Sequence, residues 1–198
     1  MTTSIKLVFA SGNVHKINEI SAIIDPRIDL ISMRDLGYEG EIDEYGTSLD
    51  QNAKIKSDFI FERYGMNCFS DDTGLEINSL KGDPGVYSAR YAGDNCSFDD
   101  NMNKVLNLLG NDQNRMASFR TVINLWWNGT NHSFEGIVKG NIEFDKKGSN
   151  GFGYDPIFTP TGTTKTFAEM SRDEKSEHSH RGRATKKLID FLYKEINS

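Results

Sequence analysis

The sequence predicts an α/β domain built on a mixed β-sheet. Strand and helix patterns alternate through the first 65 residues, as they do in units with parallel strands. Two long strand patterns follow at residues 116–129 and 132–144, around the turn NGTN, which favours an antiparallel hairpin. The chain contains no repeat, no low-complexity tract and no obvious linker. We therefore expect residues 1–198 to form a single domain.

The first half of the chain predicts two strands and two helices in alternation. Residues 5–10 (IKLVFA) are apolar except for Lys6, which is typical of a buried strand. Residues 11–24 have helical spacing, and Pro26 ends that helix. A second strand is expected at residues 29–36. A second amphipathic helix is expected at residues 49–65, where a glycine provides the C-terminal signal.

The second half adds further strands and helices around the hairpin. Residues 67–72 and 74–80 predict two separate strands, and residues 86–93 predict a short extended segment. Apolar residues at helical spacing predict a helix at 98–110 and a last helix at 184–196. The early alternation of strands and helices suits parallel strands, and the late hairpin is antiparallel. Together they support a mixed sheet with flanking helices.

Composition and charge narrow the class of protein. The chain of 198 residues is 36% hydrophobic and 11% aromatic, enough for a sizeable core. Its net charge of −6 argues against a nucleic-acid polymer as partner, because that needs a basic face. The apolar run at the N-terminus is too short for a signal core or a membrane span, so we expect a cytoplasmic protein with no membrane partner. Cys68 and Cys96 are expected to be reduced, packing thiols.

The first candidate site is the turn from strand to helix at Ser11-Gly12-Asn13, with Lys16 one turn into the helix. A helix N-terminus carries backbone N–H groups and partial positive charge, which suits a phosphate. Ser11, Asn13 and Lys16 would add side-chain donors. The alternative is a simple helix cap by Ser11 or Asn13, since the full Walker pattern is absent.

Two later stretches have a possible binding role. In GSNGFGYDPIF (148–158), glycines flank Phe152 and Tyr154, which would let the backbone approach a flat ligand. The alternative is a glycine-rich turn anchored by core aromatics.

The stretch 169–184 gathers basic side chains among acids, which usually marks a solvated helix start. Its two histidines, His178 and His180, are two apart and do not share a helix face, which argues against zinc.

Asp71 and Asp72 lie side by side at the end of an expected strand. Successive side chains of a strand point to opposite faces, so only one of the two is expected to face a given cleft. A magnesium ion needs a few carboxylate oxygens together with phosphate and water, and Glu41, Asp43 and Glu44 are candidate companions. The alternative is an ordinary polar strand end that caps the next turn.

Five motifs in the same order together resemble the inosine triphosphate pyrophosphatase family of house-cleaning enzymes. They are SGNVHKINEI, NAKIK, SDDTGLEINSLKGDPGVYSARYAG, GFGYDPIF and AEMSRDEKSEHSHRGRA, which extend along essentially the whole chain. The resemblance implies an elongated α/β fold with two lobes around a nucleotide-binding cleft, usually as a homodimer. It also implies Mg2+-dependent hydrolysis of noncanonical purine nucleoside triphosphates (dITP, ITP, XTP) to the monophosphate and pyrophosphate.

The resemblance also assigns individual residues. Asp72 is the implied catalytic carboxylate and, with Glu44, the implied metal ligand. The substrate-binding residues that it implies are Ser11, Gly12, Asn13, Val14, His15, Lys16, Lys56, Thr73, Phe152, Gly153, Tyr154, Asp155, Lys175, His180 and Arg181. Thr73 stands where serine is commoner in the family and keeps the hydroxyl, whereas His178 stands where an apolar residue is frequent.

These assignments predict how the base is recognised. Lys175, His180 and Arg181 are donors that can satisfy the 6-keto oxygen of hypoxanthine or xanthine, while adenine presents its amino donor there. Phe152 would stack on the base, for about 1–3 kcal/mol. Two other functions stay open: a catalytically silent nucleotide-binding sensor of the same fold, and a related pyrophosphatase with a different base preference.

Overall fold

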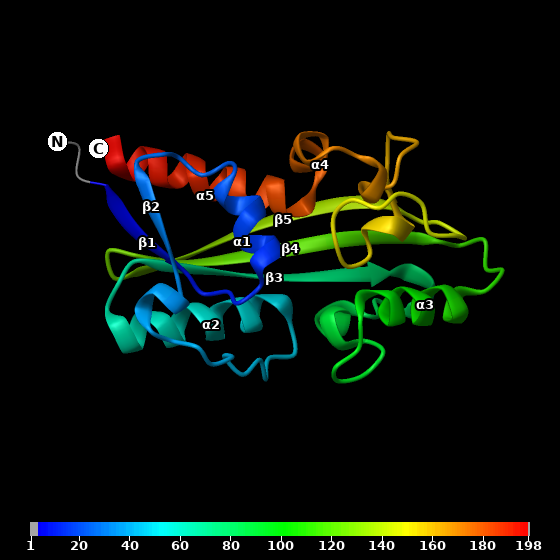
Figure 1. The fold of residues 1–198 in the computed structure, drawn as a ribbon, viewed down its shortest axis with the longest axis horizontal. Helices are drawn as coiled ribbons and strands as arrows, with labels where there is room; N and C mark the ends of the chain where they lie inside the picture. The colour runs from blue at the N-terminus through cyan, green and yellow to red at the C-terminus, as the bar shows by residue number, and fades with distance from the viewer. Residues whose placement is uncertain (1–3, 198) are drawn as a thin grey trace. The chain divides into compact units, whose positions relative to one another are not determined.

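The computed structural model describes residues 4–197 of the chain. Within that range it contains a six-stranded sheet in the order β2-β1-β3-β4-β5-β6 (Figure 1). Strand β1 (Ile5–Phe9) pairs in parallel with β2 (Ile28–Ser32) and with β3 (Cys68–Ile77), and β5 pairs antiparallel with β6 (Phe158–Pro160). The prediction of a mixed α/β sheet is therefore confirmed.

The hairpin predicted from NGTN is also present. Strands β4 (Met116–Trp127) and β5 (Thr130–Ile142) are neighbours in the sheet, joined by Asn128 and Gly129 alone. Both turn residues have positive φ, 48° and 78°, which is the backbone of a type I′ turn. Such a turn matches the twist of the strands it joins, and this explains why Asn-Gly predicts a hairpin so well.

Helices occupy most of the remaining chain. They are α1 (Val14–Ser21), α2 (Leu49–Tyr64), α3 (Phe98–Leu109), α4 (Arg172–His178) and α5 (His180–Asn197), with short 3-10 turns at Arg34–Leu36, Asn78–Leu80, Gly85–Arg90, Asp155–Ile157 and Phe167–Glu169. Ser48, Ser97 and Ser171 cap α2, α3 and α4 through side-chain acceptors, which satisfies backbone N–H groups at those ends. No helix within residues 4–197 is long and apolar enough to cross a membrane.

The chain divides into two compact units. The first takes in the chain up to Asp72, then Val122–Glu135, and the chain from Ala184 onward, and the second comprises Thr73–Thr121 and Gly136–Arg183. Each boundary falls inside a regular element, namely β3, β4, β5 and α5. The units are therefore continuous with one another through strands and a helix, without a linker.

The core of the first unit has two faces, because side chains alternate along β1. Leu7 and Phe9 lie in one cluster with Ile20 of α1 and Leu188 of α5. Val8 and Ala10 lie in another cluster with Ile60 of α2 and Cys68. Helices α1 and α5 thus cover one face of the strands in this unit and α2 covers the other. This explains why the strand over residues 5–9 is apolar on both sides.

The second unit has one core cluster in which α3 packs on the strands. Met102, Val105 and Leu109 of α3 lie in it with Leu75 and Ile77 of β3. Aromatic rings from the later strands and turns complete it, and they include Phe119, Phe158 and Phe167.

Several sequence predictions about elements are wrong. The strand expected at residues 29–36 ends at Ser32, and Arg34–Leu36 form a 3-10 helix. Residues 68–77 form one strand where two were expected, since Thr73 and Gly74 continue the ladder. Residues 85–90 form a 3-10 helix where an extended segment was expected. Ser88 stabilises this helix because its hydroxyl donates to the carbonyl of Gly85 and accepts from the N–H of Leu75. Helix α1 ends at Ser21, short of residue 24.

Candidate active site

The turn between β1 and α1 is organised by the side chains of its own residues. Asn13 is the N-cap of α1, and its Oδ1 accepts from the N–H groups of His15 (3.0 Å) and Lys16 (3.3 Å). Ser11 Oγ accepts from the N–H of Asn13 at 3.2 Å. Asn13 thus caps the helix, while Ser11 stabilises the turn before it. Gly12, Val14 and His15 of the same turn are exposed.

Lys16 pairs with the first of the adjacent aspartates. Its Nζ lies 2.9 Å from Oδ1 of Asp71, which is fully buried on β3. A buried carboxylate needs such a partner, because desolvation makes an unpaired charge costly. The pair therefore holds the ammonium of Lys16 beside the amino-terminal half of β3.

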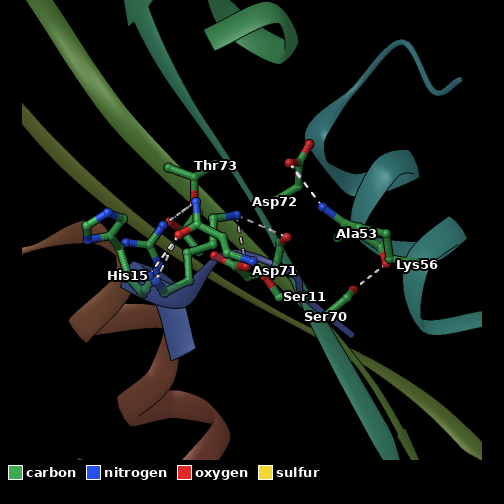
Figure 2. A network of polar contacts seen from close by, with 12 residues as sticks. Ser11, His15, Ala53, Lys56, Ser70, Asp71, Asp72 and Thr73 are labelled. Carbon is green, nitrogen blue, oxygen red and sulfur yellow. Dashed lines mark hydrogen bonds and ion pairs between the residues drawn. The ribbon is translucent and has the colours of Figure 1, made fainter. Parts of the chain in front are cut away.

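Lys56 lies between two other carboxylates. Its Nζ is 2.6 Å from Oε1 of Glu44. It also lies 3.3 Å from Oδ1 of Asp72 (Figure 2). Lys56 comes from α2, Glu44 from the loop before that helix, and Asp72 from β3. Ser70 ties the strand to the helix, since its hydroxyl donates to the carbonyl of Ala53. The structure thus brings together three residues that are far apart in the sequence, whereas Glu41 and Asp43 are exposed.

For both Asp72 and Lys56, burial and the oppositely charged neighbours shift the pKa in opposite directions. Burial raises the pKa of Asp72 above its usual range, although the ammonium groups of Lys56 and Lys16 counteract part of that effect. Burial disfavours the charged form of Lys56, but the charges of Asp72 and Glu44 outweigh it, and the pKa of Lys56 is raised. The lysine is thus cationic, and any further cation near Asp72 would stabilise the carboxylate form.

Glu44 and Asp72 fit a magnesium ion only in company with substrate oxygens. Oδ2 of Asp72 is buried and has no hydrogen-bond partner within residues 4–197. The same residues include no cluster of three or more histidine, cysteine, aspartate or glutamate side chains that could hold a metal. Magnesium is commonly bound through one or two carboxylates together with substrate phosphates and water, and two carboxylates with an unused oxygen match that pattern.

A second group of predicted residues lies in the second unit, around Phe152. The ring of Phe152 has Nζ of Lys175 4.8 Å and Cζ of Arg181 5.5 Å from its centroid. Lys175 Nζ also donates to Oδ2 of Asp155 at 2.7 Å, and that oxygen accepts from the N–H of Phe152 at 2.8 Å. Asp155 therefore holds the lysine and the backbone of the aromatic residue in one arrangement.

Thr73 joins this second group through its hydroxyl. Arg181 Nη2 donates to Oγ1 of Thr73 at 3.1 Å, and the Thr73 and Thr121 hydroxyls are hydrogen-bonded at 2.7 Å. Thr121 was not predicted, because a single threonine inside a long strand pattern carries no signal of its own. Phe98, whose ring lies 6.0 Å from that of Phe152, was also missed. An apolar residue at the first position of a helix was the available signal.

Two predicted residues are packed into the core of this unit. Tyr154 is buried, its hydroxyl donates to the carbonyl of Ser88 at 2.8 Å, and burial raises its pKa. His180 is buried with its ring stacked on Phe119 at 4.5 Å. Gly153 between Phe152 and Tyr154 has a φ of 63°, a conformation that suits glycine. The turn thus directs Phe152 and Tyr154 to different surroundings.

Comparisons with known proteins agree with this geometry. The sequence model of the Ham1 family matches residues 7–191. A dITP/XTP pyrophosphatase of Flavobacterium johnsoniae is 49% identical over 94% of this chain and 97% of its own length. One of Staphylococcus aureus is 40% identical over 97% of this chain and 98% of its own length.

Solved structures of Ham1 proteins have a fold similar to that of this chain. The Ham1 protein of Staphylococcus aureus superimposes with a TM-score of 0.88 at 40% identity, over 96% of this chain and 99% of that one. A HAM1 protein of Coxiella burnetii gives a TM-score of 0.89 at 36% identity, over the same shares of the two chains. The resemblance carried by the five motifs is thereby confirmed. From its sequence and its fold alike, the chain belongs to the Ham1 family.

Proposed function

We propose that this protein is an enzyme that hydrolyses dITP, ITP and XTP to the nucleoside monophosphate and pyrophosphate. The relatives named dITP/XTP pyrophosphatase support this function, because they match nearly the whole chain. The observation that carries it in this structure is the group of Glu44, Lys56 and Asp72, in which one buried oxygen of Asp72 has no hydrogen-bond partner within residues 4–197. Removal of such noncanonical nucleotides would cleanse the nucleotide pool, and we propose that the protein acts with that pool in the cytoplasm.

The residues of the first unit are proposed to act on the triphosphate. Lys16 and Lys56 would exchange their carboxylate partners for phosphate oxygens and balance the charge of the leaving pyrophosphate. Asp72 would orient the attacking water at the α-phosphorus. Glu44 and Asp72 would hold Mg2+, which would supply Lewis-acid polarisation of the phosphoryl oxygens. The turn from Ser11 to His15 would add backbone N–H groups at the start of α1.

The residues of the second unit are proposed to recognise the base. Phe152 would stack on the purine, and Lys175 and Arg181, which lie over the same ring, would donate to the 6-keto oxygen. Adenine would place an amino donor, in place of the 6-keto acceptor, against these donors. A buried donor without an acceptor is a strong basis for rejection, which can reach several powers of ten. Asp155 would set the position of Lys175, while His180, stacked on Phe119, would support Arg181 next to it.

A nucleotide panel with product identification tests the proposal. With Mg2+, the protein should release pyrophosphate from dITP, ITP and XTP much faster than from dATP. Orthophosphate as the first product would contradict attack at the α-phosphorus. Equal rates on dITP and dATP would contradict the proposed recognition of the base while leaving the triphosphate chemistry intact. Omission of Mg2+ in the presence of a chelator should abolish turnover.

The homodimer implied by the family resemblance is also part of the proposal. Sedimentation velocity at micromolar concentration should give the mass of two chains. A single-chain mass over the whole concentration range would contradict it.

A further inference from the structure

Asn52 is a buried asparagine of α2 with only one half of its amide engaged. Its side chain is fully buried, and Oδ1 accepts from the N–H of Gly46 at 2.8 Å. Its Nδ2 is buried too, and within residues 4–197 no atom accepts a hydrogen bond from it. A buried donor without an acceptor destabilises a folded protein, so native structures keep few of them. The unused N–H therefore needs an explanation.

The position of Asn52 suggests what would accept that hydrogen bond. Asn52 precedes Lys56 by four residues, so the two side chains share one face of α2. Gly46, which Asn52 holds, is two residues beyond Glu44, and Glu44 is paired with Lys56 at 2.6 Å. In the same group, Oδ2 of Asp72 also lacks a partner within the described chain. A phosphate with its bound cation offers an acceptor for the amide and a positive charge for the carboxylate.

The contact with Gly46 fixes the orientation of the amide. A Cβ atom on Gly46 would lie 2.5 Å from Oδ1 of Asn52 and 2.7 Å from Cβ of Gln51. Only glycine allows the loop to approach the helix this closely. Because the backbone N–H of Gly46 needs an acceptor, Oδ1 must face it, and Nδ2 is directed elsewhere.

Asn101 of α3 provides an internal comparison. Like Asn52, it is the fourth residue of its helix, it is buried, and its Oδ1 accepts from the backbone of a preceding loop, the N–H of Ala92 at 2.7 Å. Its Nδ2, however, donates to the carbonyl of Ala89 at 3.1 Å. Both halves of the Asn101 amide are thus used within the fold, which is sufficient for a structural role. Asn52 makes the same kind of contact through its Oδ1, but its Nδ2 donates to no atom of residues 4–197.

We propose that Asn52 is a further substrate-binding residue, whose Oδ1 holds the Glu44 loop and whose Nδ2 donates to an oxygen of the bound triphosphate. The inference rests on the proposed function and adds to it a neutral donor on α2, beside Lys56. It also assigns a role to Gly46, as the residue that keeps this amide turned towards the substrate.

Binding of the nonhydrolysable analogue α,β-imido-dITP in the presence of Mg2+, measured by calorimetry, tests the proposal. Asn52→Ala and Asn101→Ala should both lower the melting temperature, since each loses a buried hydrogen bond. Only Asn52→Ala should weaken binding of the analogue, by about ten- to a hundredfold, as expected for a hydrogen bond to a charged group. Equal affinities of the wild type and Asn52→Ala would overturn the proposal, and so would an equal loss in Asn101→Ala.

Asn52→Asp separates the two halves of the amide. The carboxylate keeps an acceptor for the N–H of Gly46 and replaces the donor by an oxygen that repels phosphate. Its affinity for the analogue should fall at least as far as in Asn52→Ala, with a smaller loss of melting temperature. Wild-type affinity in this variant would overturn the proposal even if Asn52→Ala fails to fold. Absence of binding by the wild-type protein would instead overturn the proposed function, and this inference with it.

Discussion

Asp71 and Asp72 are neighbours in the chain but have different partners. Asp71 is paired with Lys16, and Asp72 with Lys56. The alternation of side chains along β3 separates the two carboxylates, as the sequence predicted. Their chemical surroundings differ as well, because only Asp72 keeps a buried oxygen without a hydrogen bond within the described chain.

The two aspartates should therefore respond differently to substitution. Asp72→Asn removes the carboxylate proposed to orient water and bind metal, so kcat should fall by about 10²–10⁴-fold while the analogue still binds. Asp71→Asn keeps an acceptor for Lys16, so its main effect should be on KM. Steady-state kinetics on dITP with both variants measures this contrast. Substantial turnover in Asp72→Asn would show that the carboxylate assignment is wrong.

The two cysteines should differ in reactivity. Cys68 is buried against α2, and burial, with the nearby charge of Asp58, raises the pKa of its thiol to about 12. Its thiolate is therefore almost absent at pH 8, whereas Cys96 is only half-buried. Titration of the native protein at pH 8 with a chromogenic disulfide should detect one reactive thiol per chain, and two after denaturation. Two fast-reacting thiols in the native state would contradict the packing of Cys68.

At the scale of elements, helix α2 places a cation where the metal is proposed to bind. The ammonium of Lys56 contacts the same two carboxylates that are proposed as metal ligands. Two unit charges about 4 Å apart repel by about 4 kcal/mol at an effective dielectric constant of 20. A divalent cation would therefore bind weakly until a triphosphate draws the lysine away.

Removal of that charge should strengthen metal binding to the nucleotide-free protein. Lys56→Met keeps the buried stem of the side chain and removes the ammonium, so affinity for Mn2+ should rise at least about tenfold. Free Mn2+ can be followed by its electron paramagnetic resonance signal. Lys54→Met is the control, because Lys54 lies two residues earlier in α2 and is paired with Asp58, and it should leave the affinity unchanged. Unchanged affinity in Lys56→Met would exclude the competition.

Most elements could be predicted from the sequence because their signals are local. The Asn-Gly turn, the apolar run of β1 and the terminal glycine of α2 each depend on residues close together in the chain. The errors lie where distant contacts decide the conformation. Ser88 stabilises a 3-10 helix partly through Leu75, thirteen residues earlier. No local pattern contains that contact.

The residues of the candidate site were predicted by other means than the elements. Glu44, Lys56 and Asp72 were assigned through the family resemblance, and the structure brings them together. The role of Asp71 as partner of Lys16 was not predicted, because it depends on a contact across 55 residues. The burial of Tyr154 was not predicted either. It follows from the turn at Gly153, which sends neighbouring aromatic residues to different places.

At the scale of the whole molecule, the two compact units share their regular elements. Every boundary between them lies within β3, β4, β5 or α5, so neither unit can unfold without breaking a strand or helix of the other. Scanning calorimetry should therefore show one cooperative transition, with the calorimetric enthalpy equal to the van't Hoff enthalpy. Two resolved transitions would show that the units unfold independently and would contradict a single domain.

The boundary within β3 falls between Asp72 and Thr73, and this has a consequence for how the family can diversify. With the roles proposed above, residues that handle the triphosphate belong to one set of chain segments, and residues that recognise the base belong to the other. Substitutions confined to 73–121 and 136–183 can then alter which nucleobase is accepted without touching Lys16, Glu44, Lys56 or Asp72. A directed-evolution library for new base preference can be restricted to those segments, and its members would inherit the hydrolytic chemistry unchanged.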